Sequence, residues 1–357
     1  MPLILSGAAG SSTLDSSTGL AIATWTTATR PSSPVAGQIG YSSTFTTLEV
    51  YNGSAWEIIN GVWTTATRPT TPPMGTIGYN TTTGQIEAYN SATAVWANAG
   101  TSGVTYSATY LIVAGGGSGG NGLGSSTYAS AGGGAGGLLS GTQTLTIGTT
   151  YSFVVGAGGT VPAVGSNSTG FSLTAIGGGC GVPTGAASKN GGSGGGGGDP
   201  VGAADTTGGT GTAGQGNAGG NNSGGQGTSA GGGGAGAAGS GTQGGVGLSN
   251  SITGSAVFYA GGGSGTSGST VTGGNGGGGN GGTVGNSTAG TANTGGGGGG
   301  TQAGNSTDQK GKNGGSGVVI LSVPTANYTG TTTGSPTITT SGSNTIIKFT
   351  VSGSYTA

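Results

Sequence analysis

The sequence lacks histidine, has a single cysteine and carries very little charge. Without histidine the chain can form neither a Ser-His-Asp triad nor a Cys-His pair. Only 4% of its 357 residues are charged, and the net charge is −1. Such a chain has no basic surface that would attract nucleic acid or an anionic membrane. We therefore predict no nucleic-acid partner, and the residue types indicate no cofactor and no metal site.

Cysteine pairs and long apolar runs are absent too. Cys180 has no second cysteine for an intramolecular disulfide, and we expect it to be a small buried residue. No apolar segment approaches the roughly 20 residues that a membrane helix needs. The N-terminus has no basic region of the kind that begins a signal peptide. These absences predict no membrane insertion, and a chain that stays in a cytosol or leaves the cell by lysis.

The few acidic residues leave little scope for catalysis. A glycosidase needs only two carboxylates, and Asp199 with Asp205 is the pair to consider. Both lie in a glycine-rich stretch with few neighbours that could bury and so tune a carboxyl group. We predict that the protein is not an enzyme.

Glycine is the residue in excess. The chain holds 95 glycines, most of them between about residues 114 and 317. Glycine loses more backbone freedom on folding than any other residue, so the tract is either a flexible linker or held by many contacts. Strand-like apolar interruptions at 151–155 and 256–260 favour order. The ordered alternative is a set of left-handed polyglycine helices, with three residues per turn, that hydrogen-bond to one another.

The first hundred residues hold an internal repeat. The segment from Trp25 to Pro34 is restated from Trp63 to Pro72, and the Gly-x-Ile-Gly-Tyr and Glu-x-Tyr-Asn motifs return after it. Each copy reads as two short strands around a turn. One copy has too few apolar residues to bury its own face, so we expect threefold association to supply a partner. Two pairs of charges repeat as well, and we expect Arg30 and Arg68 to pair with Glu49 and Glu87 more readily than to read a ligand.

These motifs carry a resemblance. Thr-Arg-Pro-x-x-Pro, Gly-x-Ile-Gly-Tyr and Glu-x-Tyr-Asn resemble short modules that recur in the tail fibres of tailed bacteriophages, except that Gly40 and Gly78 stand where arginine is common. The second half, from Tyr110-Leu111-Ile112-Val113 onward, is similar to glycine-rich domains at the ends of phage fibres. Its glycine blocks resemble the fibre-tip adhesins of T-even-like phages, whose tips stack polyglycine helices and present variable loops. Together the resemblances cover about residues 24–357.

The predicted fold is all-β. Short β-repeat modules precede a glycine-rich β-sandwich with packed polyglycine-II-like segments, in a trimeric fibre or spike. We divide the chain into an N-terminal attachment segment (1–23), β-repeats (24–61 and 62–100) and a glycine-rich β domain (101–357). In that domain the polyglycine tract occupies about 114–317, and closing strands lie at 317–323 and 345–351. Within the strands, Ile112 and Ala114 should face one side of a sheet and Leu111 and Val113 the other.

The resemblance implies a virion protein made in the host cytoplasm. Its N-terminal segment would contact other virion proteins, the chain would form a homotrimer, and its glycine-rich end would bind a bacterial surface receptor, protein or glycan. A tail or capsid decoration protein without a receptor is the alternative, and a fibre-borne polysaccharide-degrading enzyme is a third.

Recognition needs side chains, so receptor contacts should lie in the polar interruptions between glycine blocks. The alternative is that these interruptions are solvated turns kept polar for solubility. The candidate receptor-binding residues are Tyr128, Lys189, Asn190, Asp199, Asp205, Asp308, Lys310 and Lys312.

Overall fold

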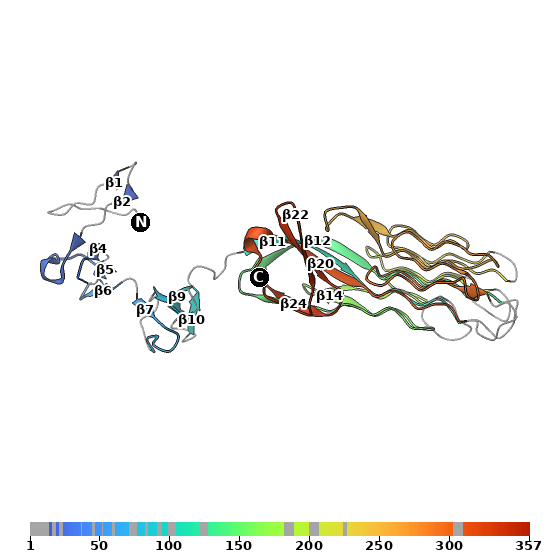
Figure 1. The fold of residues 1–357 in the computed structure, drawn as a ribbon, viewed down its shortest axis with the longest axis horizontal. Coiled ribbons are helices and arrows are strands. Elements are labelled where there is room, and N and C mark those ends of the chain that lie inside the picture. The colour runs from blue at the N-terminus through green and yellow to red at the C-terminus, as the bar shows by residue number, and fades with distance from the viewer. Residues whose placement is uncertain are drawn as a thin grey trace. The chain divides into compact units, whose positions relative to one another are not determined.

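The computed structural model describes residues 14–15, 19–20, 24–36, 38–44, 47–51, 53–58, 61–70, 77–82, 85–90, 95–98, 105–121, 128–181, 189–199, 207–223, 227–302 and 310–357. The chain divides into two compact units, Met1–Val104 and Thr105–Ala357. Over these ranges the regular structure is β-strand, with short 3₁₀ turns η1 (Thr27–Thr29) and η2 (Thr325–Asn327) and no α-helix. The predicted all-β class is therefore confirmed (Figure 1).

In the first unit the repeated sequence forms a repeated sheet. The first copy contains β3 (Thr24–Trp25), β4 (Ile39–Ser42), β5 (Thr47–Tyr51) and β6 (Trp56–Ile58) in the order β3-β4-β5-β6. The second contains β7 (Gly61–Trp63), β8 (Ile77–Asn80), β9 (Gln85–Asn90) and β10 (Val95–Asn98) in the order β10-β9-β8-β7. In each sheet the first strand pairs in parallel and the others pair antiparallel. Ahead of them, β1 (Leu14–Asp15) pairs with β2 (Gly19–Leu20).

The second unit is built on a five-stranded antiparallel sheet in the order β12-β11-β20-β23-β22. Its strands are β11 (Thr105–Val113), β12 (Leu138–Thr146), β20 (Val318–Pro324), β22 (Thr337–Ser341) and β23 (Asn344–Phe349). Strands from both ends of the glycine-rich tract therefore pair directly, because β11 precedes the tract and β20 follows it. This pairing fixes where the tract leaves the sheet and where it returns.

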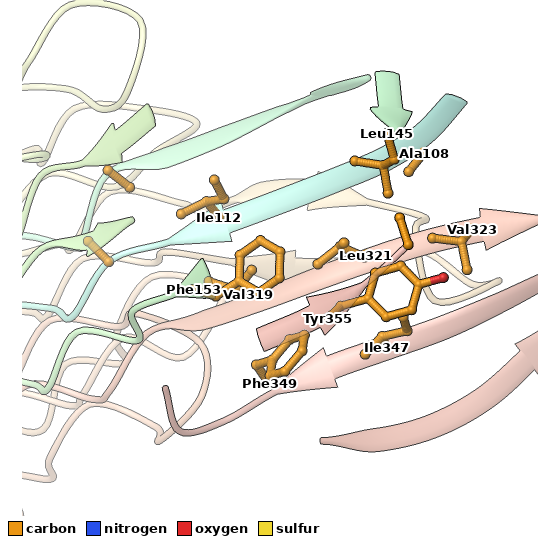
Figure 2. Packing of buried hydrophobic residues seen from close by; sticks show 13 residues of the cluster. Ala108, Ile112, Leu145, Phe153, Val319, Leu321, Val323, Ile347, Phe349 and Tyr355 are labelled. Atoms are coloured by element: carbon orange, nitrogen blue, oxygen red, sulfur yellow. The ribbon is translucent and has the colours of Figure 1, made fainter. Parts of the chain in front are cut away.

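Apolar residues on one face of this sheet form a core with a second, three-stranded sheet. That sheet contains β13 (Thr150–Phe153), β24 (Gly353–Thr356) and β21 (Thr332–Thr333) in the order β13-β24-β21. Ile112, Leu321 and Phe349 from the large sheet pack with Phe153 and Tyr355 from the small one (Figure 2). Burial of these side chains is the main apolar stabilisation that the second unit has.

The opposite face of the sheet is also buried. Leu111, Val113 and Ile320 pack there against Tyr259 and Ala260 from the glycine-rich part. The predicted division of β11, with Ile112 on one face and Leu111 and Val113 on the other, is confirmed. Within the glycine-rich part, β14 (Ser168–Gly170) pairs with β15 (Leu173–Ala175), β16 (Leu248–Asn250) with β17 (Val257–Tyr259), and β18 (Gly282–Thr283) with β19 (Thr301–Gln302).

The glycine-rich segments extend from the sheets as a bundle of strand-like chains (Figure 1). Segment 114–120, which continues β11, shows how they are joined. Its backbone N–H groups donate to three neighbouring segments in turn. Ala114, Gly117 and Gly120 donate to the carbonyls of Gly137, Gly134 and Ala131, respectively. Gly115 and Ser118 donate to those of Ser166 and Ala163, and Gly116 and Gly119 donate to those of Gly315 and Lys312. Every third residue therefore bonds the same neighbour, and partner numbers fall as donor numbers rise, so these neighbours run antiparallel.

Other segments donate back to 114–120. The backbone carbonyls of Gly115, Gly116 and Gly117 accept from the N–H groups of Gly178, Gly159 and Gly298. Segment 131–137 is bonded in the same way, for example through Gly133 to Gly298 and Gly134 to Gly179. The backbone polar groups that a glycine-rich chain cannot satisfy internally are thus satisfied between segments.

Glycine is required in these segments because the backbones approach one another closely. A Cβ atom added at Gly117 would fall against the carbonyl oxygen of Gly179, and one added at Gly133 against that of Gly117. Where a side chain does fit, it is small, and at Ser168 it also takes part in the hydrogen bonding. Ser168 is fully buried, and its hydroxyl donates to Val113 O and accepts from Gly156 N, each at 2.8 Å.

Candidate functional site

Segment 114–120 continues β11 away from the five-stranded sheet, and a group of connected residues lies beyond its last residue. We call this group the distal cluster; it contains Asn121, Tyr128, Ala129, Asp199, Asn222, Gly227, Gln302 and Lys310. Most of these residues border a stretch outside the described residues: 122–127, 200–206, 224–226 or 303–309.

Asp199 lies at the centre of the hydrogen bonds in the distal cluster. Its carboxylate oxygen Oδ2 accepts from the backbone N–H of Gly227 at 2.7 Å and from that of Ala129 at 3.2 Å. The residue is only 4% exposed. A buried carboxylate is stabilised by such charge-assisted hydrogen bonds, which here join three separate stretches of chain.

Further contacts tie the remaining members to this centre. Ala129 forms an antiparallel bridge with Gln302, and Asn121 forms one with Lys310. The Asn222 side chain donates through Nδ2 to Gly198 O and to Thr228 O, each at 2.8 Å. The borders of all four stretches are therefore held at one end of the bundle.

Two buried serine hydroxyls hydrogen-bond neighbouring glycine-rich segments next to the distal cluster. Ser130 Oγ donates to Thr301 O at 3.1 Å and accepts from Thr301 N at 2.8 Å. Ser229 Oγ donates to Ser130 O at 2.8 Å and accepts from Thr266 N at 3.0 Å. Both serines are about 1% exposed. Each hydroxyl uses its donor and an acceptor position, so these two serines join neighbouring glycine-rich segments beside the distal cluster.

Each repeat of the first unit has a buried glutamate at its centre. Glu49 is 1% exposed, and its carboxylate accepts from Trp25 Nε1 and Arg30 Nε at 3.0 Å each and forms an ion pair with Arg30. In the second repeat, Glu87 accepts from Trp63 Nε1 at 3.0 Å and Arg68 Nη2 at 2.8 Å. The predicted pairing of both arginines with glutamate is confirmed.

Burial acts to raise the pKa of the Glu49 carboxyl, but the hydrogen bonds from Arg30 and Trp25 outweigh it. The pKa of Glu49 therefore lies below its usual value. The Trp25 indole also lies against Gly40, since a Cβ added there would fall on its ring. Glycine at this position makes room for the tryptophan that the glutamate holds.

The glycine-rich part has a counterpart among known proteins. A family model for a glycine-rich domain matches residues 96–324. The chain belongs to the glycine-rich domain family. The match takes in the hydrogen-bonded segments and the distal cluster, and it ends at the last residue of β20. No curated protein and no solved structure matches the chain.

The glycine-rich domain brings some predicted receptor-binding residues together and not others. Tyr128, Asp199 and Lys310 all belong to the distal cluster, where Tyr128 is half-buried and Lys310 is exposed. Lys312 is half-buried two residues further on, and its backbone bonds Gly119 and Gly299. Asp205 and Asp308 lie outside the described residues.

The side chains of Lys189 and Asn190 form hydrogen bonds in another part of the glycine-rich domain. Lys189 Nζ donates to Thr207 O at 3.0 Å and to its Oγ1 at 3.2 Å, and burial lowers the pKa of this lysine. Asn190 Oδ1 accepts from Thr210 N at 2.9 Å. Both side chains therefore help to join the stretch after residue 188 to the stretch after residue 206.

The sequence interpretation missed Asn121, Asn222 and Gln302. The only signal for them is their position, since each is a polar residue beside a glycine block. Cys180 is buried as predicted, and burial raises the pKa of its thiol. Across the residues that the structure describes, no helix is long and apolar enough to cross a membrane, and no group of three or more His, Cys, Asp or Glu could hold a metal ion.

Proposed function

We propose that the chain is a virion appendage protein of a tailed bacteriophage, a tail fibre or spike, whose glycine-rich domain binds the host cell surface. The observation that carries the proposal is the distal cluster. A bundle of hydrogen-bonded glycine-rich backbones supports it, and residues from several separate parts of the chain meet there. Recognition residues are commonly carried at one end of such a scaffold.

We infer further that the glycine-rich segments are polyglycine-II helices. The support is the pattern of hydrogen bonds from segment 114–120, in which every third residue bonds the same neighbour. Three residues per turn with bonds only to neighbouring chains is the geometry of that helix. Membership of the glycine-rich domain family agrees with the composition such packing needs.

A competition experiment tests whether the protein binds the host surface. Purified protein, added to host bacteria before the virus that carries it, should reduce virus adsorption in proportion to the fraction of receptors occupied. Protein unfolded by heat is the control and should have no effect. Full adsorption in the presence of saturating folded protein would favour a decoration protein without a receptor.

We propose a homotrimer as the working assembly. Its support is the small apolar core of each repeat, together with apolar side chains left at the surface of the glycine-rich domain. Leu248 and Phe258, on paired strands β16 and β17, are each 43% exposed. In a chain with so few apolar residues, such a surface is suited to contact with another copy. Light scattering should give three times the 32.6 kDa chain mass, and a stable folded monomer would contradict the trimer.

A further inference from the structure

We propose that Asp199 is a positioning residue, which holds Ala129 and Gly227 of the distal cluster in place without itself contacting the receptor. This inference rests on the proposed function of the distal cluster. It assigns Asp199 a role different from the direct contact that the sequence suggests. Burial is the first reason, because a residue that is 4% exposed offers the receptor almost no surface.

The second reason is which backbone groups the carboxylate holds. The backbone N–H groups of Ala129 and Gly227 donate to the same oxygen, Oδ2. Ala129 lies just after stretch 122–127, Gly227 follows stretch 224–226, and Asp199 itself precedes stretch 200–206. One oxygen atom therefore connects the borders of three stretches that are far apart in the sequence.

The fourth stretch is coupled to the same centre. Ala129 pairs with Gln302, which precedes stretch 303–309. On the other side, Asn222 donates to the carbonyl of Gly198, next to Asp199 in the chain. If the carboxylate is removed, two N–H groups at the base of the cluster lose their acceptor together. The borders should then separate while the glycine segments below stay paired.

Two substitutions at Asp199 distinguish positioning from contact. Asp199→Ala removes the acceptor, so amide hydrogen exchange at Ala129 and Gly227 should accelerate by about tenfold or more, and the purified variant should block virus adsorption at least tenfold less well. Asp199→Asn keeps one carbonyl oxygen, which can accept both bonds, so it should restore slow exchange and most of the blocking.

A matched control separates this effect from a general loss of stability. Ser168 is also buried and also joins two other stretches through one side chain, but it does so beside β11 at the sheet. Ser168→Ala should lower the melting temperature and leave blocking unchanged. Normal exchange and blocking by Asp199→Ala would overturn the proposal. Lost blocking by Asp199→Asn with slow exchange retained would also overturn it, because the charge would then contact the receptor.

Amide hydrogen exchange tests the role of Asp199 separately from the proposed receptor binding. If the wild-type protein fails to block adsorption, the proposed function fails. Exchange at Ala129 and Gly227 in the Asp199→Ala variant still decides whether this carboxylate holds the borders together.

Discussion

Single residues set the spacing of the glycine-rich segments. Ala131, Ala135 and Ala230 are fully or almost fully buried among the same backbones that exclude a Cβ at Gly117 and Gly133. A methyl group therefore fits at some positions in these segments, whereas at others it would clash with a backbone carbonyl. The choice among glycine, alanine and serine is therefore a packing choice at each position, in the same way as residue size in an apolar core.

Gly196 tests this packing. An added Cβ would fall against the carbonyl oxygen of Ala230, so Gly196→Ala should force two segments apart at a cost of about 1–3 kcal/mol. The melting temperature of the second unit, measured by calorimetry, should fall by several degrees. Gly282→Ala is the control, because its Cβ would lie 3.3 Å from the Asn286 side chain and meet no carbonyl. Equal shifts for both variants would contradict close packing at Gly196.

Glu49 gives the first unit a dependence on pH. Its pKa is lower in the folded protein than the ordinary value of 4.5, so its ionised form stabilises the fold above that pH. The stabilisation is lost as the pH falls from about 4.5 through the folded pKa. All the tryptophans belong to this unit, and their fluorescence should report its easier unfolding by urea at pH 3 than at pH 6. Glu49→Gln should be less stable at pH 6 and should lose less on acidification; an unchanged pH dependence would contradict the assignment.

At the scale of elements, the apolar strands could be predicted and the glycine segments could not. Alternation identified the two faces of β11, and the repeated charges identified the pairing of Arg30 with Glu49. Each repeat was predicted with two strands but has four. The additional strands are short and lie at the sheet edges, for example β3 and β6, where two or three residues leave no alternation to read. Glycine segments have no side-chain pattern, so nothing in the sequence says which segment lies beside which.

Strand β20 should contribute most to the stability of the second unit, because it is central in the sheet and buried on both faces. Leu321→Ala removes a fully buried side chain and should destabilise the unit by about 2–5 kcal/mol. Ile338→Ala, on edge strand β22 and 39% exposed, should cost about 0.5 kcal/mol or less. Denaturant unfolding followed by circular dichroism gives both values. Similar costs at the two positions would contradict the central role of β20.

At the scale of the whole molecule, we expect the sheets to determine stability and the distal cluster to determine recognition. In the proposed function, the sheets supply apolar burial, the glycine segments join the sheets to the distal cluster, and the distal cluster carries the receptor contacts. Stability and recognition should therefore respond to different substitutions. Lysines at the two ends of the second unit allow this separation to be measured, because the chain has so few charged residues.

Lys310 belongs to the distal cluster and is exposed, and Lys312 follows it two residues later. Replacing both with alanine should weaken the blocking of virus adsorption, since cationic groups on an almost uncharged surface are effective contacts for a receptor. Lys310 is exposed, Lys312 is half-buried, and neither belongs to the apolar core, so the melting temperature should stay within about 1–2 °C. Lys348→Ala, on β23 of the large sheet, removes a charge at the other end and should leave blocking intact. Equal loss of blocking in both variants would mean a nonspecific charge effect, and full blocking by the double variant would place the receptor contacts on other residues.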